Sequence, residues 1–83
     1  MTLLEFLNQF VGWDSQLFVI YRKRIVDGKV AYDDFPPMSF CELCDNDDLA
    51  SKLLSTKVVS IDSDCEFDDK LGLFSYLTIN VEE

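Results

Sequence analysis

The first hydrophobic positions of the chain repeat with the period of a helix. Between Leu3 and Val11, apolar residues recur at i, i+3, i+4 and i+7, which is the stripe of an amphipathic α-helix. Thr2 and Glu5 have the spacing of a capping box, in which each side chain accepts a hydrogen bond from the backbone amide of the other residue. Gly12 is well placed to end the helix.

The next pattern is that of a β-hairpin. Residues 16–26 and 29–35 are rich in β-branched and aromatic side chains and predict two strands. Asp27-Gly28 joins them and is the strongest short signal for a tight turn. The turn brings a basic run roughly opposite two acids, which favours cross-strand ion pairs over binding of an external anion. The residues concerned are Arg22, Lys23, Arg24, Asp33 and Asp34.

Short helices are predicted after this hairpin. Ser39 and Glu42 repeat the capping-box spacing, so a helical turn should follow Ser39. Asp47 or Asp48 can cap a second short helix over residues 49–54. The order of elements continues with two further strands.

These strands are predicted at residues 57–62 and 71–81. The segment between them, SIDSDCEFDDK at residues 60–70, carries five acids and one base. We expect it to form the tip of a hairpin, because hairpin tips are solvated.

The elements predict one α+β domain over residues 1–83, in the order αββααββ. Two hairpins should merge into a single four-stranded antiparallel sheet, with an N-terminal helix and one or two short helices on one face. Strands 16–26 and 71–81 are the most apolar and are placed centrally. Part of the sheet's apolar surface then lies opposite the main core, where it either binds a partner or is covered by helices or loops. This second patch consists of Phe18, Ile20, Phe74 and Tyr76.

The net charge of −9 is concentrated in the second half of the chain. Residues 1–40 have a balance of −1 and residues 41–83 a balance of −8. A field of this sign repels nucleic acid and anionic membranes and attracts basic surfaces. The apolar start lacks the positive residues of a secretory signal, and no apolar run approaches the roughly 18 residues of a membrane span. We expect a cytoplasmic protein whose partner is a protein with a basic surface.

The composition also excludes several kinds of catalysis. The sequence has no histidine, which excludes Ser-His and Cys-His nucleophilic pairs and histidine-based zinc sites. It has three glycines and no glycine-rich phosphate loop. A domain of this size offers little depth for a catalytic cleft. We therefore expect a non-enzymatic protein with no cofactor.

The cysteines form a C-x-x-C motif, Cys41 and Cys44, with Cys65 further along the chain. An odd number of cysteines without a secretory signal indicates reduced thiols. The pair could open a zinc site with Cys65 and an aspartate, act as a redox pair, or pack in the core. The missing second ligand pair and the missing βαβ setting favour packing.

The acidic stretch has three interpretations. Its alternating acids match the first ligand positions of an EF-hand loop, but Phe67 stands at the required glycine and Leu73 at the bidentate glutamate, so only a looser calcium site stays open. On an extended chain, alternate acids lie on one side about 6.6–6.8 Å apart, close to two nucleotide rises along a DNA strand. Such a row could occupy a groove built for phosphate, or it could be a solvated turn that keeps the protein soluble. The candidate partner-binding residues are Asp45, Asp47, Asp48, Asp62, Asp64, Glu66, Phe67 as an apolar anchor, Asp68 and Asp69.

The whole chain resembles a recurring type of small acidic protein carried by phages and other bacterial mobile elements. The shared features are an MTLLEFL helix, a strand hairpin, a short acidic helix, the segment LLSTKVVSI and a closing strand with an acidic end. The resemblance implies a protein that blocks host defence or host nucleic-acid enzymes, as anti-CRISPR proteins do. It assigns no role to any single residue.

The function that we predict is therefore an interaction protein. It inhibits a basic, nucleic-acid-handling host protein, such as a nuclease or effector, through an acidic surface that imitates DNA. The alternative is a small structural or assembly protein that forms a homodimer or larger oligomer through an apolar sheet face or an edge strand.

Overall fold

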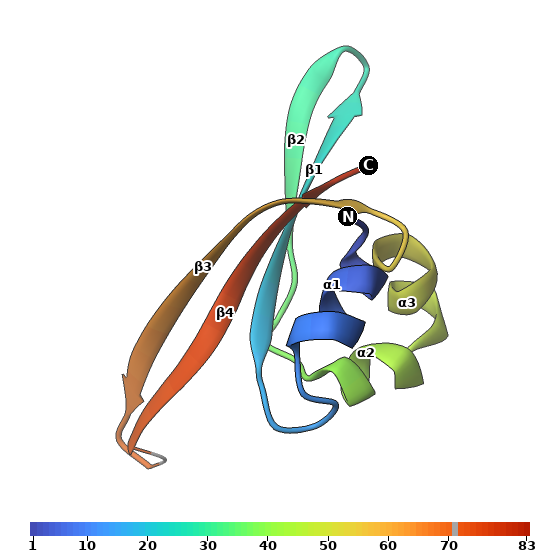
Figure 1. Cartoon of the computed structure of the whole chain (residues 1–83). Helices are drawn as coiled ribbons and strands as arrows, with labels where there is room; N and C mark the ends of the chain where they lie inside the picture. Colours follow the sequence, from blue (N-terminus) through green and yellow to red (C-terminus); the bar gives the residue numbers. More distant parts are fainter. Residues whose placement is uncertain (71) are drawn as a thin grey trace.

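The computed structural model describes residues 1–70 and 72–83, without the side chains of Glu66, Asp68 and Phe74. In this part of the chain, three helices accompany one four-stranded sheet, so the predicted α+β class is confirmed (Figure 1). The elements are α1 (Leu3–Phe10), β1 (Phe18–Val26), β2 (Lys29–Asp34), α2 (Phe40–Asp45), α3 (Asp47–Leu53), β3 (Lys57–Asp68) and β4 (Gly72–Glu82). None of the helices in these residues is long enough to cross a membrane, which takes about 20 residues.

Two of the helices begin at the predicted capping boxes. Thr2 Oγ1 accepts a hydrogen bond from the Glu5 amide at 3.2 Å, and the Glu5 carboxylate accepts one from the Thr2 amide at 3.1 Å. Ser39 and Glu42 make the same reciprocal pair at the start of α2. Because each box satisfies two amides that have no partner inside the helix, even these short helices have defined starts.

The third helix begins differently from the prediction. Asn46 caps α3, since its side-chain oxygen accepts a hydrogen bond from the Leu49 amide at 3.2 Å. Asp47 and Asp48, which we expected as caps, lie in the first turn instead. Negative charge is favourable there because it faces the positive end of the helix dipole.

The predicted turn between β1 and β2 is confirmed. Asp27 and Gly28 both have positive φ angles, 52° and 77°, and Val26 pairs with Lys29 across them. Two left-handed residues in a two-residue loop match the twist of the flanking strands. The two turn residues therefore determine the register of this hairpin.

The sheet is mixed and not antiparallel as predicted. Its strand order is β2-β1-β4-β3; the two hairpins are antiparallel, but β1 and β4 run parallel in the middle. The reason is the path of the chain between the hairpins. α2 and α3 lead it from the end of β2 back towards the other end of the sheet, where β3 begins (Figure 1). β4 therefore returns in the direction of β1.

The helices cover the face of the sheet that carries Phe18 and Ile20. Both side chains are fully buried, and Ile20 lies opposite Ile79 of β4. The prediction that Phe18 and Ile20 form a second patch away from the core is therefore wrong. Both faces of β1 carry apolar residues, so alternation separated the faces without showing which one meets the helices. The core cluster consists of Leu3, Phe6, Leu7, Val11, Phe18, Ile20, Met38, Phe40, Leu43, Leu53, Ile79 and Val81.

β3 is twice as long as predicted. It extends over 12 residues from Lys57 to Asp68, so most of the acidic stretch is strand and not a solvated loop. Asp69 and Lys70 lie in the turn, and Gly72, where β4 begins, has a φ of 82°. Leu71, the first residue of the predicted last strand, lies outside the described residues. Aspartate is a poor strand former, but here every residue from Ser60 to Asp68, the acids included, pairs with a residue of β4.

Candidate protein-binding surface

The outer half of the β3–β4 hairpin extends beyond the helices (Figure 1). β3 and β4 stay paired as far as Asp68 opposite Gly72, whereas the pairing of β4 with β1 begins only at Leu77 opposite Phe18. Residues 62–70 and 72–76, which we call the arm, therefore form a two-stranded ribbon over most of their length. β3 is also an edge strand of the sheet.

The acidic row lies along this edge. Asp62 and Asp64 are exposed and occupy alternate positions opposite Thr78 and Tyr76, so they share one face of the ribbon. Asp64 accepts a hydrogen bond from the Cys65 amide at 2.9 Å. No ion pair between described side chains involves either aspartate. Two carboxylates of the predicted row are therefore exposed, and no ion pair among the described side chains compensates their charge.

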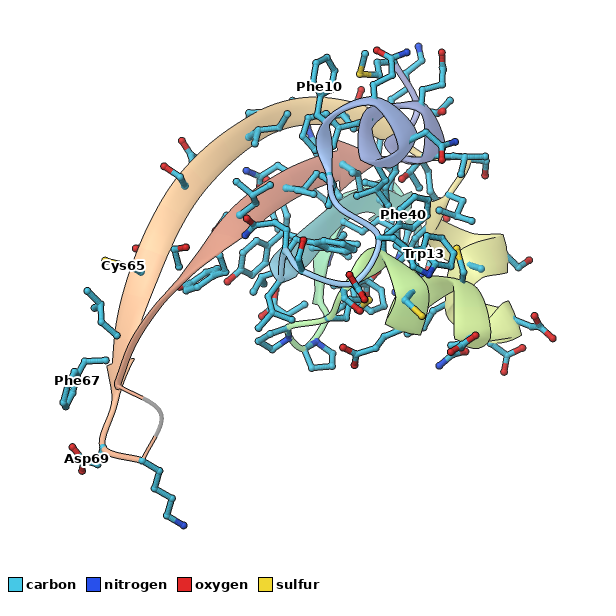
Figure 2. The ribbon with its side chains drawn as sticks, turned by 60° about the horizontal axis from the view of Figure 1, so that its bottom comes forward. Phe10, Trp13, Phe40, Cys65, Phe67 and Asp69 are labelled. Atoms are coloured by element: carbon cyan, nitrogen blue, oxygen red, sulfur yellow. The ribbon has the colours of Figure 1, made fainter. Side chains whose placement is uncertain are left out.

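The other members of the predicted row are placed differently. Glu66 and Asp68 continue the alternate positions in the β3 register, but their side chains lie outside the described residues. Asp69 is exposed in the turn at the tip of the arm (Figure 2). The strand thus carries the spacing of the row, and the turn carries its last acid.

Phe67 does not anchor the centre of the row. It pairs with Leu73, and alternation places it on the opposite face from Asp62 and Asp64. Phe67 and Leu73 are 72% and 73% exposed, so they form an apolar cross-strand pair at the end of the arm, where Figure 2 shows Phe67 projecting from the ribbon. The arm is therefore acidic on one face and apolar near its tip on the other.

The second acidic cluster is at a different part of the molecule. Asp45, Asp47 and Asp48 are exposed around the junction of α2 and α3, on the opposite side of the molecule from the tip of the arm (Figure 1). The longest dimension of the chain is 42 Å. The predicted single acidic surface is therefore divided into two, and only the arm has the extended spacing.

The basic run of β1 is engaged within the first hairpin. Arg22 lies opposite Asp33, and its Nη2 donates to Asp33 Oδ2 at 2.8 Å, while Arg24 Nε donates to the same oxygen at 2.6 Å. The hydrogen bonds from Arg24 and then Arg22 lower the pKa of the Asp33 carboxyl, and the contact with Asp33 raises the pKa of Arg24. The predicted cross-strand pairing is confirmed for these residues. Lys23 and Asp34 make no ion pair with another described side chain.

The three thiols do not come together. Cys44 packs against the core and Cys41 lies on the same short helix, whereas Cys65 is exposed in the arm (Figure 2). Burial raises the pKa of the Cys44 thiol, and the neighbouring Cys41 adds to the effect. Within residues 1–70 and 72–83, no three His, Cys, Asp or Glu side chains are grouped to hold a metal ion. The packing interpretation is confirmed for Cys44.

The structure adds an exposed apolar surface that the sequence pattern did not predict. The face of the sheet away from the helices leaves large apolar side chains exposed on β1, β2 and β3. The alternation of valine and tyrosine with alanine and aspartate in residues 30–33 was its only signal. These exposed side chains are Tyr21, Ile25, Val30, Tyr32 and Val59.

Comparison with known proteins gives no relative to draw on: no family model, no curated protein and no solved structure matches this chain.

Proposed function

We propose that this chain is a non-enzymatic protein that binds and inhibits a nucleic-acid-handling protein, with the acidic row of its arm seated in the partner's cationic groove. The observation that carries the proposal is the position of Asp62 and Asp64. Both are exposed on an extended edge strand, and no cation among the described side chains pairs with them. A carboxylate left uncompensated in this way keeps its full attraction for a basic surface.

The shape of the arm supports this use of the charge. A β-strand sets alternate side chains about 6.6–6.8 Å apart, which is near two nucleotide rises along one strand of DNA. Because the ribbon extends past the helices (Figure 1), the arm could enter a groove that binds a nucleic-acid backbone while the rest of the chain stays outside the groove. Attraction between exposed charges is screened by salt, so the binding should weaken as salt rises.

The first test is capture from a bacterial lysate with the tagged chain, at low and at moderate salt, followed by mass spectrometry of the bound proteins. The proposal expects a nucleic-acid-binding protein that is lost at the higher salt. The purified partner is then incubated with labelled duplex DNA, and the chain should displace the DNA in proportion to its concentration. A partner that binds DNA and the chain simultaneously would contradict the proposal.

Two matched variants distinguish the effect of the arm on binding from the effect of overall negative charge. One carries Asp62→Asn, Asp64→Asn and Asp69→Asn. The other carries the same three-fold neutralisation at the α2–α3 junction and therefore has the same net charge. The arm variant should lose at least about tenfold in affinity, since each lost charge contact of this kind contributes up to about 1 kcal/mol. Equal losses in both variants would show that net charge alone drives the binding. The junction substitutions are Asp45→Asn, Asp47→Asn and Asp48→Asn.

A further inference from the structure

The second edge of the sheet, β2, is free and unlike the first. Among the described strands, β2 pairs only with β1 and lies at the end of the strand order. Its hairpin projects past the helices (Figure 1), and Val30, Tyr32 and Asp34 are all exposed. A free edge strand presents unpaired amides and carbonyls, which are a template for another strand.

The hydrogen-bond pattern shows which residues of β2 face outwards. The Phe35 amide donates to the Ile20 carbonyl at 3.1 Å, at the end of the β1–β2 register. In an antiparallel pair, bonded and non-bonded positions alternate. The backbone groups of Ala31 and Asp33 are therefore turned towards β1, and those of Val30, Tyr32 and Asp34 point to the open edge.

We infer that two copies of the chain pair through β2, antiparallel, with Val30 of each copy opposite Tyr32 of the other. Only Val30, Tyr32 and Asp34, whose backbone groups point outwards, can exchange hydrogen bonds with the second copy. The registers available to a symmetric dimer therefore differ by a shift of one strand by two residues. In the inferred register Lys29 lies opposite Asp33 of the second copy, and Ala31 lies opposite itself. Each pair is favourable or neutral: an aromatic beside a β-branched side chain, and a cation beside an anion.

The neighbouring registers are poorer. One step away from the turn places Tyr32 opposite Tyr32 and pairs Lys29 with no acid, and a second step places Asp33 opposite Asp33. One step towards the turn places Val30 opposite Val30 and Lys29 opposite Ala31, and a further step loses most of the strand overlap. The inferred register alone combines an opposite-charge pair with no like-charge pair.

The edge formed by β3 cannot associate in the same way. Its acids occupy alternate positions from Asp62 to Asp68. The same step-of-two rule places acid opposite acid in every symmetric register over this stretch, and like charges directly opposite are destabilising. A second copy of the chain therefore fits the β2 edge and not the β3 edge. No acid of the arm takes part, so the inference does not rest on the proposed function.

Exposed apolar side chains of the outer sheet face also favour this dimer. In the inferred register, Ile25, Val30 of the same copy and Tyr32 of the other copy lie side by side on one face, because cross-strand neighbours share a face. All three side chains are exposed in the single chain. Their burial on both sides of the two-fold axis adds an apolar strip to the main-chain hydrogen bonds.

The mass of the untagged chain in solution tests the inference. An interface of one short strand from each copy is below the roughly 1,000 Å² of a stable complex, so light scattering should cover protein concentrations from about 10 µM to about 1 mM. We expect a concentration-dependent rise from 9.6 kDa towards twice that mass. Lys29→Glu should raise the dissociation constant at least about tenfold, because it replaces an attraction with a repulsion at two symmetric positions. Lys57→Glu has the same charge change on the far edge of the sheet and should leave the constant within about twofold.

A cysteine pair tests the register itself. In a background with Cys41→Ala, Cys44→Ala and Cys65→Ser, Ala31→Cys should form an intermolecular disulfide on mild oxidation. The reason is that the two Cα atoms of a non-bonded pair lie about 4.5 Å apart, within the range of about 4.4–6.8 Å that a disulfide spans. Tyr32→Cys is the matched control and should cross-link poorly. A chain that stays at 9.6 kDa and cross-links no better at position 31 than at 32 would overturn the inference, and so would a stronger cross-link at 32.

Discussion

Replacing Ile20 with alanine should destabilise the fold far more than the same replacement at Ile25, although both residues lie in β1. Ile20 is 0% exposed and Ile25 is 71% exposed. Truncating a buried isoleucine to alanine costs about 2–5 kcal/mol, because the lost contacts leave a cavity. At roughly 0.05–0.15 kcal/mol per residue, a chain of this length has about 4–12 kcal/mol of stability in total. The change at Ile25 should cost less than about 1 kcal/mol.

Urea denaturation measures the difference directly. Trp13 packs edge-on against Phe40, with ring centroids 4.8 Å apart, so its fluorescence should report loss of the core (Figure 2). The measurement belongs at low micromolar protein, where association through β2 does not contribute. In a thermal scan with the same fluorescence probe, Ile20→Ala should lower the melting temperature by more than about 8 °C, and Ile20→Val should fall between it and the wild type.

Equal losses at the two positions would refute the placement of the core. The sequence pattern alone assigned Ile20 to a patch outside the core, and on that assignment truncating Ile20 would create no cavity. A greater loss at Ile25 than at Ile20 would mean that the opposite face of the sheet is buried. Far-UV circular dichroism of each variant at zero urea shows whether it is folded before the comparison is made.

Three further measurements follow from local features of the structure. The ion pairs that lower the pKa of Asp33 stabilise the fold above the carboxyl's unfolded pKa of about 3.9, and this contribution is lost as pH falls through the lower folded pKa. The urea midpoints of wild type and Asp33→Asn should therefore differ near neutral pH and converge in acid. A difference that does not change with pH would contradict this. Gly28 has a φ of 77°, so Gly28→Ala should cost about 1–2 kcal/mol in the same assay, whereas an unchanged midpoint would exclude the left-handed turn. Cys65 is exposed while burial raises the pKa of Cys44, so a thiol reagent should modify Cys65 first, and Cys65→Ser should remove the fastest phase.

Features with a local cause could be predicted from the sequence. The capping boxes at Thr2 and Ser39 depend on residues three positions apart, and the Asp27-Gly28 turn depends on two adjacent residues. The ion pairs of Asp33 follow from that turn, because a two-residue loop fixes which side chains lie opposite. In each case the partners are so close in sequence that no tertiary contact is needed to choose between alternatives.

Features that depend on distant contacts could not be predicted in this way. The parallel pairing of β1 with β4 joins Phe18 to Leu77, which are far apart in the chain, and the hairpin signals contain no information about it. The choice of buried face failed for the same reason, since Ile20 and Tyr21 are both suitable for a core until the helices are placed. The length of β3 was underestimated because aspartate is rare in isolated strands, whereas a long paired ribbon tolerates acids at exposed positions.

The two edges of the sheet make the two proposals separable by experiment. A dimer through β2 would place two four-stranded sheets side by side, with β3 and its acidic row at each outer end. A partner with two cationic grooves would then be bound with avidity, since the second contact becomes intramolecular. Lys29→Glu should weaken capture of such a partner only by lowering the fraction of dimer, and higher protein concentration should restore it. Neutralising Asp62, Asp64 and Asp69 should weaken capture at every concentration. The mass in solution, which reports the fraction of dimer, should not change. If Lys29→Glu weakened capture of a monovalent partner, the β2 edge and not the arm would be the contact.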